Sequence, residues 1–180
     1  MVVASLELSL VHSDDMAAPL RRVVLDLCTR AYAEDFEPYL RLLSPAVHLL
    51  GRLHGELVTH AAWIERDLHS PPTGPLRTAY VEAVATLPEW QGRGFASALL
   101  SRIPALVADF DLAALSPSSE AFYARLGWER WQGPLSYRQP DGTIVATPEE
   151  VVMICRLPRT PSTLDPGAPL STGWRPGEVW

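Results

Sequence analysis

The hydrophobic pattern of this chain changes its period near the middle of the sequence. Residues 76–86 contain Val, Tyr, Thr and small apolar residues, which is typical of a strand. After Pro88, large apolar side chains recur every three or four positions, which predicts a helix from about Gly94. Pro104 lacks a main-chain donor and its ring clashes with the preceding turn, so we expect a kink or a restart of the helix there. A strand followed by a helix restricts the fold to a sheet with helices packed on it.

The rest of the chain predicts further strands and helices. Strands are expected at residues 7–12, 47–53, 57–65, 111–115 and 151–157, and helices at 19–33 and 118–126. His54 and Gly55 predict a hairpin turn between two of these strands. The order predicts an α+β fold, with a mixed, mostly antiparallel central sheet flanked by helices. A length of 180 residues is that of a single domain with one core.

No stretch of the sequence has the composition of a membrane span or a secretory signal. No run of about 18 apolar residues occurs, and residues 1–11 include Glu7 but no basic residue. We therefore expect a cytoplasmic protein with no membrane partner. Cys28 and Cys155 lie in apolar segments, where reduced cysteines packed in the core are expected in that compartment.

The charge pattern argues against a nucleic-acid partner. The formal net charge is -6, and all 15 basic residues are arginines scattered along the chain. The absence of lysine excludes Schiff-base chemistry on this chain and a phosphate-binding P-loop. A cationic ligand would be favoured where several carboxylates converge on one cleft.

A short loop between the predicted strand and helix is the first candidate binding site. Its residues are Gln91, Gly92, Arg93, Gly94, Phe95 and Ala96. Main-chain amides at the start of a helix point toward a bound anion, and the helix dipole favours negative charge there. Gly92 and Gly94 lack a Cβ, which lets a pyrophosphate approach the backbone, and Arg93 adds a charged donor. Because a glycine turn before a helix is common, the loop alone indicates phosphate binding only weakly.

Glu82 is the first candidate catalytic residue. It lies in an otherwise apolar run, where a carboxylate is costly unless it balances an arginine or serves a function. Its position alone leaves both interpretations open. The glycine loop follows about ten residues later, at the same end of the predicted sheet, which favours function.

Tyr123 is a second candidate, one turn into the predicted helix 118–126. Its phenol either packs half-buried in the core or protonates a leaving thiolate. A phenol pKa of about 10 and a thiol pKa of about 8.5 are close enough for proton transfer in either direction.

No metal site and no serine hydrolase site is predicted. The spacings of the histidines match no set of metal ligands, and no Gly-x-Ser-x-Gly motif is present. The histidines are His12, His48, His54, His60 and His69.

The segment from 158 to 180 gives two opposing indications. Five prolines and three glycines favour a disordered tail. Trp174 and Trp180 favour a docked one, because indoles rarely remain in water when they can pack.

Together these features resemble the GNAT superfamily of N-acetyltransferases. The shared features are the strand with a central glutamate, the sequence Gln91-x-x-Gly94-x-Ala96, Phe122-Tyr123 and Gly127-Trp128. Over nearly its whole length the chain is also similar to aminoglycoside 2'-N-acetyltransferases. The matching stretches are residues 33–36, 80–82, 114–116, 127–128 and 174–180, and the last of these is the most specific.

The resemblance implies an enzyme that transfers the acetyl group of acetyl-CoA to an amino group of an aminoglycoside antibiotic, at the 2' position, and so gives resistance. The transfer is direct, without an acyl-enzyme and without a metal. The resemblance implies one acetyltransferase domain over residues 1–180, with 158–180 as a docked C-terminal tail, and it is compatible with a homodimer.

The resemblance also assigns roles to individual residues. Glu82 is the catalytic base, acting directly or through a water, and Tyr123 is the acid. The pantetheine arm binds to Val84, Ala85 and Thr86, and the pyrophosphate to Gln91, Gly92, Arg93, Gly94, Phe95 and Ala96. The pocket for the cationic amino sugar is lined by Asp35, Glu82, Ala83, Ser116, Glu149, Glu150, Glu178 and the terminal carboxylate of Trp180. Glu150 and Glu178 stand where the family has aspartates.

Other functions remain open at this point. One is a GNAT enzyme that acetylates a different amine, such as a kasugamycin-like amino sugar, a polyamine or a natural product. Another is a non-catalytic module that binds acyl-CoA, and a third is a generic interaction domain, for which the glycine loop would bind nothing.

Overall fold

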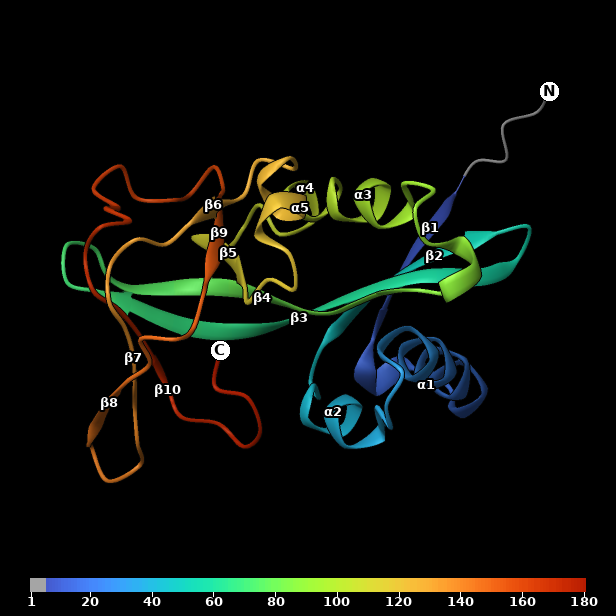
Figure 1. Cartoon of the computed structure of the whole chain (residues 1–180), viewed down its shortest axis with the longest axis horizontal. Helices are drawn as coiled ribbons and strands as arrows, with labels where there is room; N and C mark the ends of the chain where they lie inside the picture. Colours follow the sequence, from blue (N-terminus) through green and yellow to red (C-terminus); the bar gives the residue numbers. More distant parts are fainter. Residues whose placement is uncertain (1–5) are drawn as a thin grey trace. The chain divides into compact units, whose positions relative to one another are not determined.

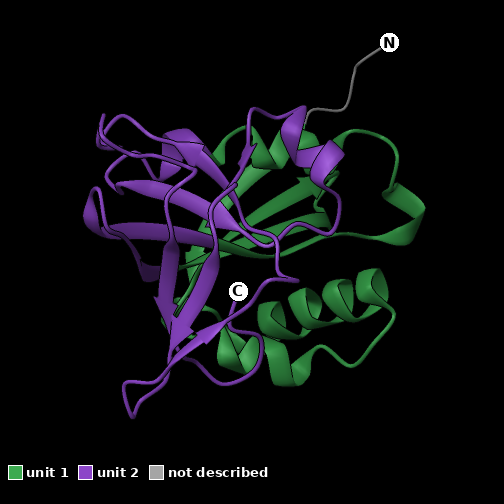
Figure 2. Ribbon diagram, turned by 60° about the vertical axis from the view of Figure 1, so that its left-hand side comes forward, with its two compact units in different colours: residues 1–64, 81–103 green, residues 65–80, 104–180 purple. Residues whose placement is uncertain are grey.

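The computed structural model describes residues 6–180 (Figure 1). Within this range the strands form one sheet, in the order β6-β9-β5-β4-β3-β10-β7-β8, with β2 also pairing to β3 and β1 to β2. The chain divides into two compact units, each described by itself below (Figure 2). The first comprises the described residues up to 64 and residues 81–103, and the second comprises residues 65–80 and 104–180.

The first unit contains the N-terminal hairpins and helices. Its strands are β1 (Glu7–His12), β2 (Val47–Leu53) and parts of β3 (Glu56–Ser70) and β4 (Gly74–Thr86). Its helices are α1 (Ala18–Tyr32), α2 (Glu37–Leu42) and α3 (Phe95–Leu100), with short 3-10 turns at η1 (Ser13–Asp15) and η2 (Pro88–Trp90). Helices α1 and α2 lie on one face of β2 and β3, and α3 lies on the other (Figure 1).

Amphipathic packing holds this unit together. Val24, Leu27 and Cys28 form the buried stripe of α1, at the spacing that a helix requires for one apolar face. They pack with Leu40 of α2 and Leu50 of β2 in one core cluster. The hairpin between β2 and β3 turns at His54 and Gly55, which have φ values of 52° and 83°. Two successive left-handed residues are what a two-residue hairpin turn requires, so the predicted hairpin is confirmed.

The second unit is built from shorter strands. They are β5 (Leu112–Leu115), β6 (Glu129–Arg130), β7 (Leu135–Arg138), β8 (Ile144–Ala146), β9 (Met153–Arg156) and β10 (Leu170–Gly173), with α5 (Glu120–Ala124) before β6. β5 runs parallel to β4, with Thr78 opposite Leu112, and antiparallel to β9. β10 runs antiparallel to β3 and parallel to β7. The sheet is therefore mixed, as predicted.

The helix after the glycine loop breaks at the expected place. α3 ends at Leu100, and α4 (Ile103–Leu106) begins after two intervening residues, with Pro104 as its second residue. Proline is tolerated in the first turn of a helix, where its missing donor has no intrahelical partner. The predicted restart is confirmed.

The last residues of the chain are ordered, so the indication of disorder from their composition was wrong. β10 lies in this segment, and Trp180 is only 3 % exposed. Sheet pairing and a buried indole outweigh the prolines, all of which lie outside β10.

Three further expectations concern the chain as a whole. Cys28 and Cys155 are buried free thiols, as expected. No helix within residues 6–180 is long and apolar enough to cross a membrane. The absence of a secretory signal was expected from residues 1–11, of which 1–5 lie outside the described range.

Candidate active site

β4 extends well beyond its parallel neighbour. The pairing of β4 with β5 runs from Thr78 to Tyr80, whereas β4 continues to Thr86. Ala83 lies in this continuation with a φ of 51°, in the left-handed region that L-residues rarely adopt. A left-handed residue inside a strand interrupts its regular alternation, as in a β-bulge. Glu82 and the three residues predicted to bind pantetheine all belong to this irregular part of β4.

The three residues predicted to bind pantetheine have carbonyl groups that are already held by side chains. The Tyr32 hydroxyl donates to Val84 O at 3.0 Å, and the Thr59 hydroxyl donates to Ala85 O at 3.1 Å. Gln91 Nε2 donates to Thr86 O at 3.0 Å, which ties the loop to the end of the strand. These bonds fix the main chain of β4, and each carbonyl oxygen has a second lone pair for a ligand.

The glycine loop has the conformation that an anion site needs. Gly92 and Gly94 have φ values of 72° and 83°, and no atom lies within 4 Å of the position that a Cβ would take at either residue. The Ala98 amide makes the first bond of α3, to Gly94 O at 2.9 Å, so the amides of residues 95–97 precede it. Arg93 lies over the Trp90 ring, 4.7 Å from its centroid. The backbone at this turn is therefore open to a ligand.

Glu82 is half-buried in β4, between the buried residues Val81 and Ala83. Its neighbour Ala83 is the left-handed residue, and the Ala83 carbonyl accepts a hydrogen bond from His60 Nδ1 at 2.8 Å. The carboxylate is thus attached to a part of β4 whose main chain is fixed by a neighbouring side chain.

Two buried histidines next to this strand were not recognised from the sequence. His48 Nδ1 and His60 Nε2 are 2.9 Å apart, and the two side chains are 2 % and 0 % exposed. Burial lowers the pKa of His60 to about 3, and His48 beside it adds to the effect. Burial and the nearby Arg21 lower the pKa of His48 to about 4. Both rings are therefore neutral at physiological pH. The available signal was two histidines inside apolar runs on either side of the predicted hairpin.

Tyr123 is buried in α5, and its protonation differs from the expectation. Its ring makes edge contacts with Phe122 and Trp128, at centroid distances of 5.1 Å and 6.1 Å. Burial raises the pKa of Tyr123 to about 12, although a hydrogen bond with Ser118 opposes the shift. Full proton transfer to a thiolate, whose conjugate acid has a pKa of about 8.5, is uphill from this phenol. Tyr123 is thus suited to donate a hydrogen bond, and its role as the acid stays a prediction.

The remaining predicted substrate residues lie on exposed loops. Asp35 lies between α1 and α2, where its Oδ1 accepts from the Glu37 amide at 3.1 Å. The others belong to the second unit and are exposed: Ser116, Glu149, Glu150 and Glu178. The carboxylates of the three glutamates and the hydroxyl of Ser116 are therefore available to a ligand.

The C-terminal end is fixed by bonds within the second unit. Trp180 Nε1 donates to the Thr147 hydroxyl at 2.9 Å. Arg66, 9 % exposed on β3, donates to Val179 O at 2.6 Å and to the Thr172 hydroxyl at 2.8 Å. Its guanidinium also lies over the Tyr80 ring, 4.8 Å from the centroid. Sequence reasoning missed Arg66, because it lies between Glu65 and Asp67, in a charged stretch that does not indicate burial.

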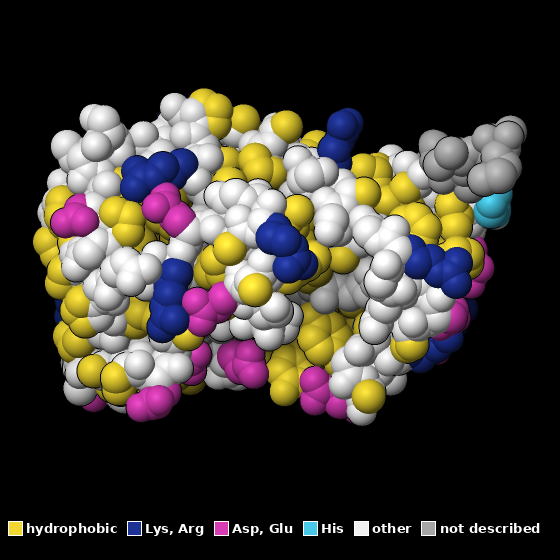
Figure 3. All heavy atoms as spheres, turned by 45° about the horizontal axis from the view of Figure 1, so that its top comes forward, with side chains coloured by type: hydrophobic (Ala, Val, Ile, Leu, Met, Phe, Trp, Pro, Cys, Tyr) yellow, Lys and Arg dark blue, Asp and Glu magenta, His cyan; other side chains and the backbone are white. Residues whose placement is uncertain are grey.

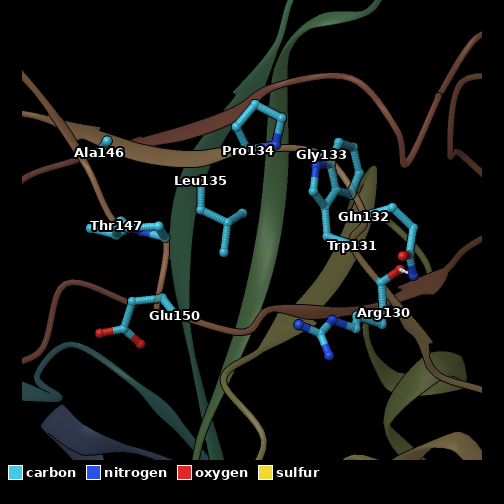
Figure 4. Close-up of a pocket in the computed structure, with 10 residues that line it drawn as sticks. Arg130, Trp131, Gln132, Gly133, Pro134, Leu135, Ala146, Thr147 and Glu150 are labelled. Carbon is cyan, nitrogen blue, oxygen red and sulfur yellow. Dashed lines mark hydrogen bonds between the residues drawn. The ribbon is translucent and has the colours of Figure 1, made fainter.

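A pocket of ≈ 390 Å³ lies in the second unit and includes one predicted site residue. Trp131, Pro134 and Leu135 line it with apolar surface (Figure 4). Glu150 and Arg130 also line the pocket, as does Thr147, whose hydroxyl accepts the hydrogen bond from the Trp180 indole. The pocket thus combines an apolar wall with an acidic group.

The surface shows no concentration of basic charge on the face drawn in Figure 3, where several arginines lie beside carboxylates. Among the described residues, ion pairs join Arg30 to Glu89, Arg77 to Glu65 and Arg156 to Glu129. Within residues 6–180, no three His, Cys, Asp or Glu side chains converge as metal ligands do.

Comparison with known proteins identifies the family. The profile of the acetyltransferase (GNAT) domain matches residues 20–131. A protein of Mycolicibacterium fortuitum named aminoglycoside 2'-N-acetyltransferase is 34% identical over 183 residues, which cover 95% of this chain and 90% of that protein.

Solved structures show the same fold at low sequence identity. The GNAT family N-acetyltransferase YhbS of Escherichia coli, in complex with CoA, is 14% identical with a TM-score of 0.62, over 93% of this chain and 91% of that one. A probable N-acyltransferase of Enterococcus faecalis V583 is 21% identical with a TM-score of 0.59, over 71% of this chain. The match covers 33% of that second structure, so this chain spans about a third of its length.

The matched range 20–131 contains Glu82, the glycine loop and Tyr123, and it includes residues of both units. The predicted fold class is therefore confirmed. This chain belongs to the GNAT family of acetyltransferases.

Proposed function

We propose that this enzyme transfers the acetyl group of acetyl-CoA to the 2' amino group of an aminoglycoside. The observation that carries the proposal is the relative named aminoglycoside 2'-N-acetyltransferase, which is 34% identical over 95% of this chain. Similarity over 95% of the chain extends well beyond the general GNAT match at residues 20–131.

The loop after β4 would hold the pyrophosphate of acetyl-CoA. The amides of residues 95–97 and the open surface at Gly92 and Gly94 support this assignment. Val84, Ala85 and Thr86 would bind the pantetheine arm through main-chain groups of β4, whose positions are fixed by Tyr32, Thr59 and Gln91.

Glu82 would accept the proton that the substrate ammonium loses, directly or through a water. The amine nitrogen then attacks the thioester carbon, the carbon–sulfur bond breaks, and the second proton of the nitrogen passes to the departing sulfur, so that CoA leaves as the thiol. Tyr123 stabilises the negative charge on the sulfur with a hydrogen bond until that proton arrives. A glutamate is a weak base for an ammonium, since their ordinary pKa values differ widely, which favours a water between them. No acyl-enzyme is needed, since burial raises the pKa of Cys28 to about 12 and that of Cys155 above its usual value.

The acceptor would be bound by carboxylates. Asp35, Glu149, Glu150, Glu178 and the terminal carboxylate of Trp180 supply negative charge for a polycationic amino sugar. The exposure of the four acidic side chains supports this assignment, because a ligand can reach them without displacing a buried protein group.

The first test is direct identification of the product. The protein is incubated with acetyl-CoA and either gentamicin, tobramycin or kasugamycin, and the products are fragmented in a mass spectrometer. We expect a single acetyl group on the 2' nitrogen of gentamicin and tobramycin. Acetylation of kasugamycin alone would redirect the proposal to another amino sugar, and acetylation of none of them would contradict it.

Substitution of Gly94 tests the pyrophosphate site. Gly94→Asp places a side chain and a negative charge where the anion would approach, at a φ of 83° that only glycine adopts freely. We expect the acetyl-CoA dissociation constant to rise by at least about tenfold, or about 1.4 kcal/mol. Calorimetry measures it, and Gly142→Asp, at a φ of 90° in a distant turn, is the matched control. Equal binding by parent and folded Gly94→Asp protein would refute the loop assignment.

Deletion of residues 178–180 tests the acceptor role of the C-terminus. The Trp180 indole and the bond from Arg66 to Val179 hold this end in place, so its carboxylate would bind directionally. We expect the aminoglycoside KM to rise by at least about tenfold, equivalent to about 1.4 kcal/mol, with the acetyl-CoA KM nearly unchanged. A C-terminal tag should cause similar harm and an N-terminal tag none. Parental KM values in both the truncated and the C-terminally tagged proteins would show that the end has no part in binding.

A further inference from the structure

We propose that His60 is a positioning residue for acetyl transfer, whose ring holds the Ala83 carbonyl and thereby fixes the left-handed turn of β4 beside Glu82. The proposal rests on the proposed function in one respect, because it takes Glu82 as the base of the transfer. Its structural content, the bond from His60 to Ala83 and the conformation that depends on it, does not require a particular acceptor.

The contact itself is short and buried. His60 Nδ1 lies 2.8 Å from Ala83 O, His60 is 0 % exposed, and Ala83 is 8 % exposed. Ala83 has a φ of 51°, a conformation that costs an L-residue about 1–2 kcal/mol. Such a conformation persists where its surroundings impose it. A donor from the adjacent strand, aimed at the carbonyl of the strained residue itself, is one way of imposing it.

The hydrogen-bond directions of the histidine pair follow from its partners. A carbonyl oxygen only accepts, so His60 carries its proton on Nδ1. His60 Nε2 then accepts from His48 Nδ1 at 2.9 Å, and His48 Nε2 accepts from the Ser13 hydroxyl at 3.2 Å. Ser13 in turn accepts from the Ala46 amide at 3.0 Å. The single proton of the Ser13 hydroxyl is shared between His48 Nε2 and Ala46 O, which lies 3.1 Å from Ser13 Oγ, so the tautomer of His60 is set by the Ala83 carbonyl and the His48 Nδ1 donor.

The next residue of β4, Val84, is held by a side chain from a different element. The Tyr32 hydroxyl, from the end of α1, donates to Val84 O at 3.0 Å. Two successive carbonyls, those of Ala83 and Val84, are therefore bound by side chains of β3 and α1. In a regular strand alternate residues share a face, and a shift of one residue reverses the faces. Holding these two peptide groups fixes the direction in which Glu82 leaves the strand.

Removal of the donor should reduce the rate of transfer more than the binding of acetyl-CoA. Without His60, the buried Ala83 carbonyl loses its partner and the strand is free to relax toward extended geometry. A displacement of about 1 Å at a reacting group costs as much as about 100-fold in rate. The glycine loop is tied separately to β4 through Gln91 and Thr86, so cofactor affinity should change little.

The experiment compares variants of the full chain that differ at this position. His60→Leu removes the donor, whereas His60→Asn keeps an N–H group close to the position of Nδ1. Val24→Ala, in the buried stripe of α1, is the control for loss of core packing alone. Each protein is assayed for kcat and both KM values with acetyl-CoA and tobramycin, below its own melting temperature.

We expect His60→Leu to lower kcat by at least about 30-fold, a substantial part of the range for a misplaced reacting group, with the acetyl-CoA KM within about threefold of the parent. His60→Asn should recover kcat to within about fivefold, and Val24→Ala should keep the parental kcat despite a lower melting temperature. A parental kcat in His60→Leu, or an equal loss in folded His60→Asn, would overturn the proposal.

A second measurement does not depend on the substrate or on the folding of a variant. The ring nitrogen chemical shifts of the parent protein report which nitrogen of His60 carries the proton, and we expect Nδ1. A proton on Nε2 would overturn the proposal. If the parent acetylates no aminoglycoside, the proposed function fails, while the tautomer still decides whether His60 holds Ala83.

Discussion

Replacement of Glu82 by Gln is expected to lower kcat by about 100-fold or more at neutral pH, the usual range for loss of general-base assistance. Glutamine keeps the size of the side chain and its position on β4, so the change removes the base and leaves the strand intact. At higher pH a larger fraction of the substrate amine is already deprotonated, so activity should recover in part as the pH rises.

The measurement is a pH–rate profile of parent and Glu82→Gln proteins under saturating acetyl-CoA. Glu120→Gln is the matched control, because it makes the same chemical change at the first residue of α5. There the Glu120 carboxylate forms an ion pair with Arg130, with Oε1 and Nη1 3.0 Å apart. The control should retain the parental profile. If the profile of Glu82→Gln also matched that of the parent, Glu82 would have no part in proton transfer, and the alternative of a structural carboxylate would be correct.

The elements next to the active strand could be predicted from the sequence because each has a strong local cause. The glycine loop combines two left-handed glycines with the onset of a helical period at Phe95. Pro104 ends one helix and begins the next for the covalent reason that it lacks a donor. The hairpin at His54 and Gly55 depends on two adjacent residues only. None of these features requires knowledge of distant parts of the chain.

The contacts that fix the site could not be predicted in this way, because they join residues far apart in sequence. His60 binds the carbonyl of Ala83, and Arg66 binds the carbonyl of Val179. A sequence shows that a polar residue lies in an apolar strand, but the partner that satisfies it depends on the register and on which strands are neighbours. The position of β10 between β3 and β7 was unpredictable for the same reason.

The protonation of Tyr123 shows a similar limit for chemistry. The residue type and its place in the family motif predict a phenol near the reaction, whereas its pKa depends on burial beside Phe122 and Trp128. A buried phenol that retains its proton at all physiological pH values is always available as a donor. Its contribution to the transfer is therefore expected to be independent of pH, in contrast to that of Glu82.

Acidification from pH 7 to pH 5 is expected to destabilise the folded protein through the buried histidines. In the unfolded chain a histidine has a pKa of about 6.5. In the folded chain burial lowers the pKa of His48 to about 4 and that of His60 to about 3. Between pH 7 and pH 5 the unfolded chain therefore binds protons at these two positions and the native chain does not, so the free energy of unfolding falls as the pH falls.

The expected loss is large relative to the stability of a typical domain. Each histidine contributes up to about 1.4 kcal/mol per pH unit below the unfolded pKa, so the pair should cost about 3.5 kcal/mol between pH 7 and pH 5. Hydrogen bonds with Arg41 and Arg77 lower the pKa of Glu37 and Glu65, so these carboxylates lose their stabilising effect only at more acidic pH. The change in stability between pH 7 and pH 5 is therefore expected to come from the histidines. Denaturant titrations at pH 7, 6 and 5 measure the effect, and a His48→Asn/His60→Asn double variant, which has no titrating ring at either position, should have a much flatter dependence. Equal unfolding free energies of the parent at pH 7 and pH 5 would show that the native state accepts a proton on His48 or His60. The fold would then not require the neutral histidine pair that holds Ala83.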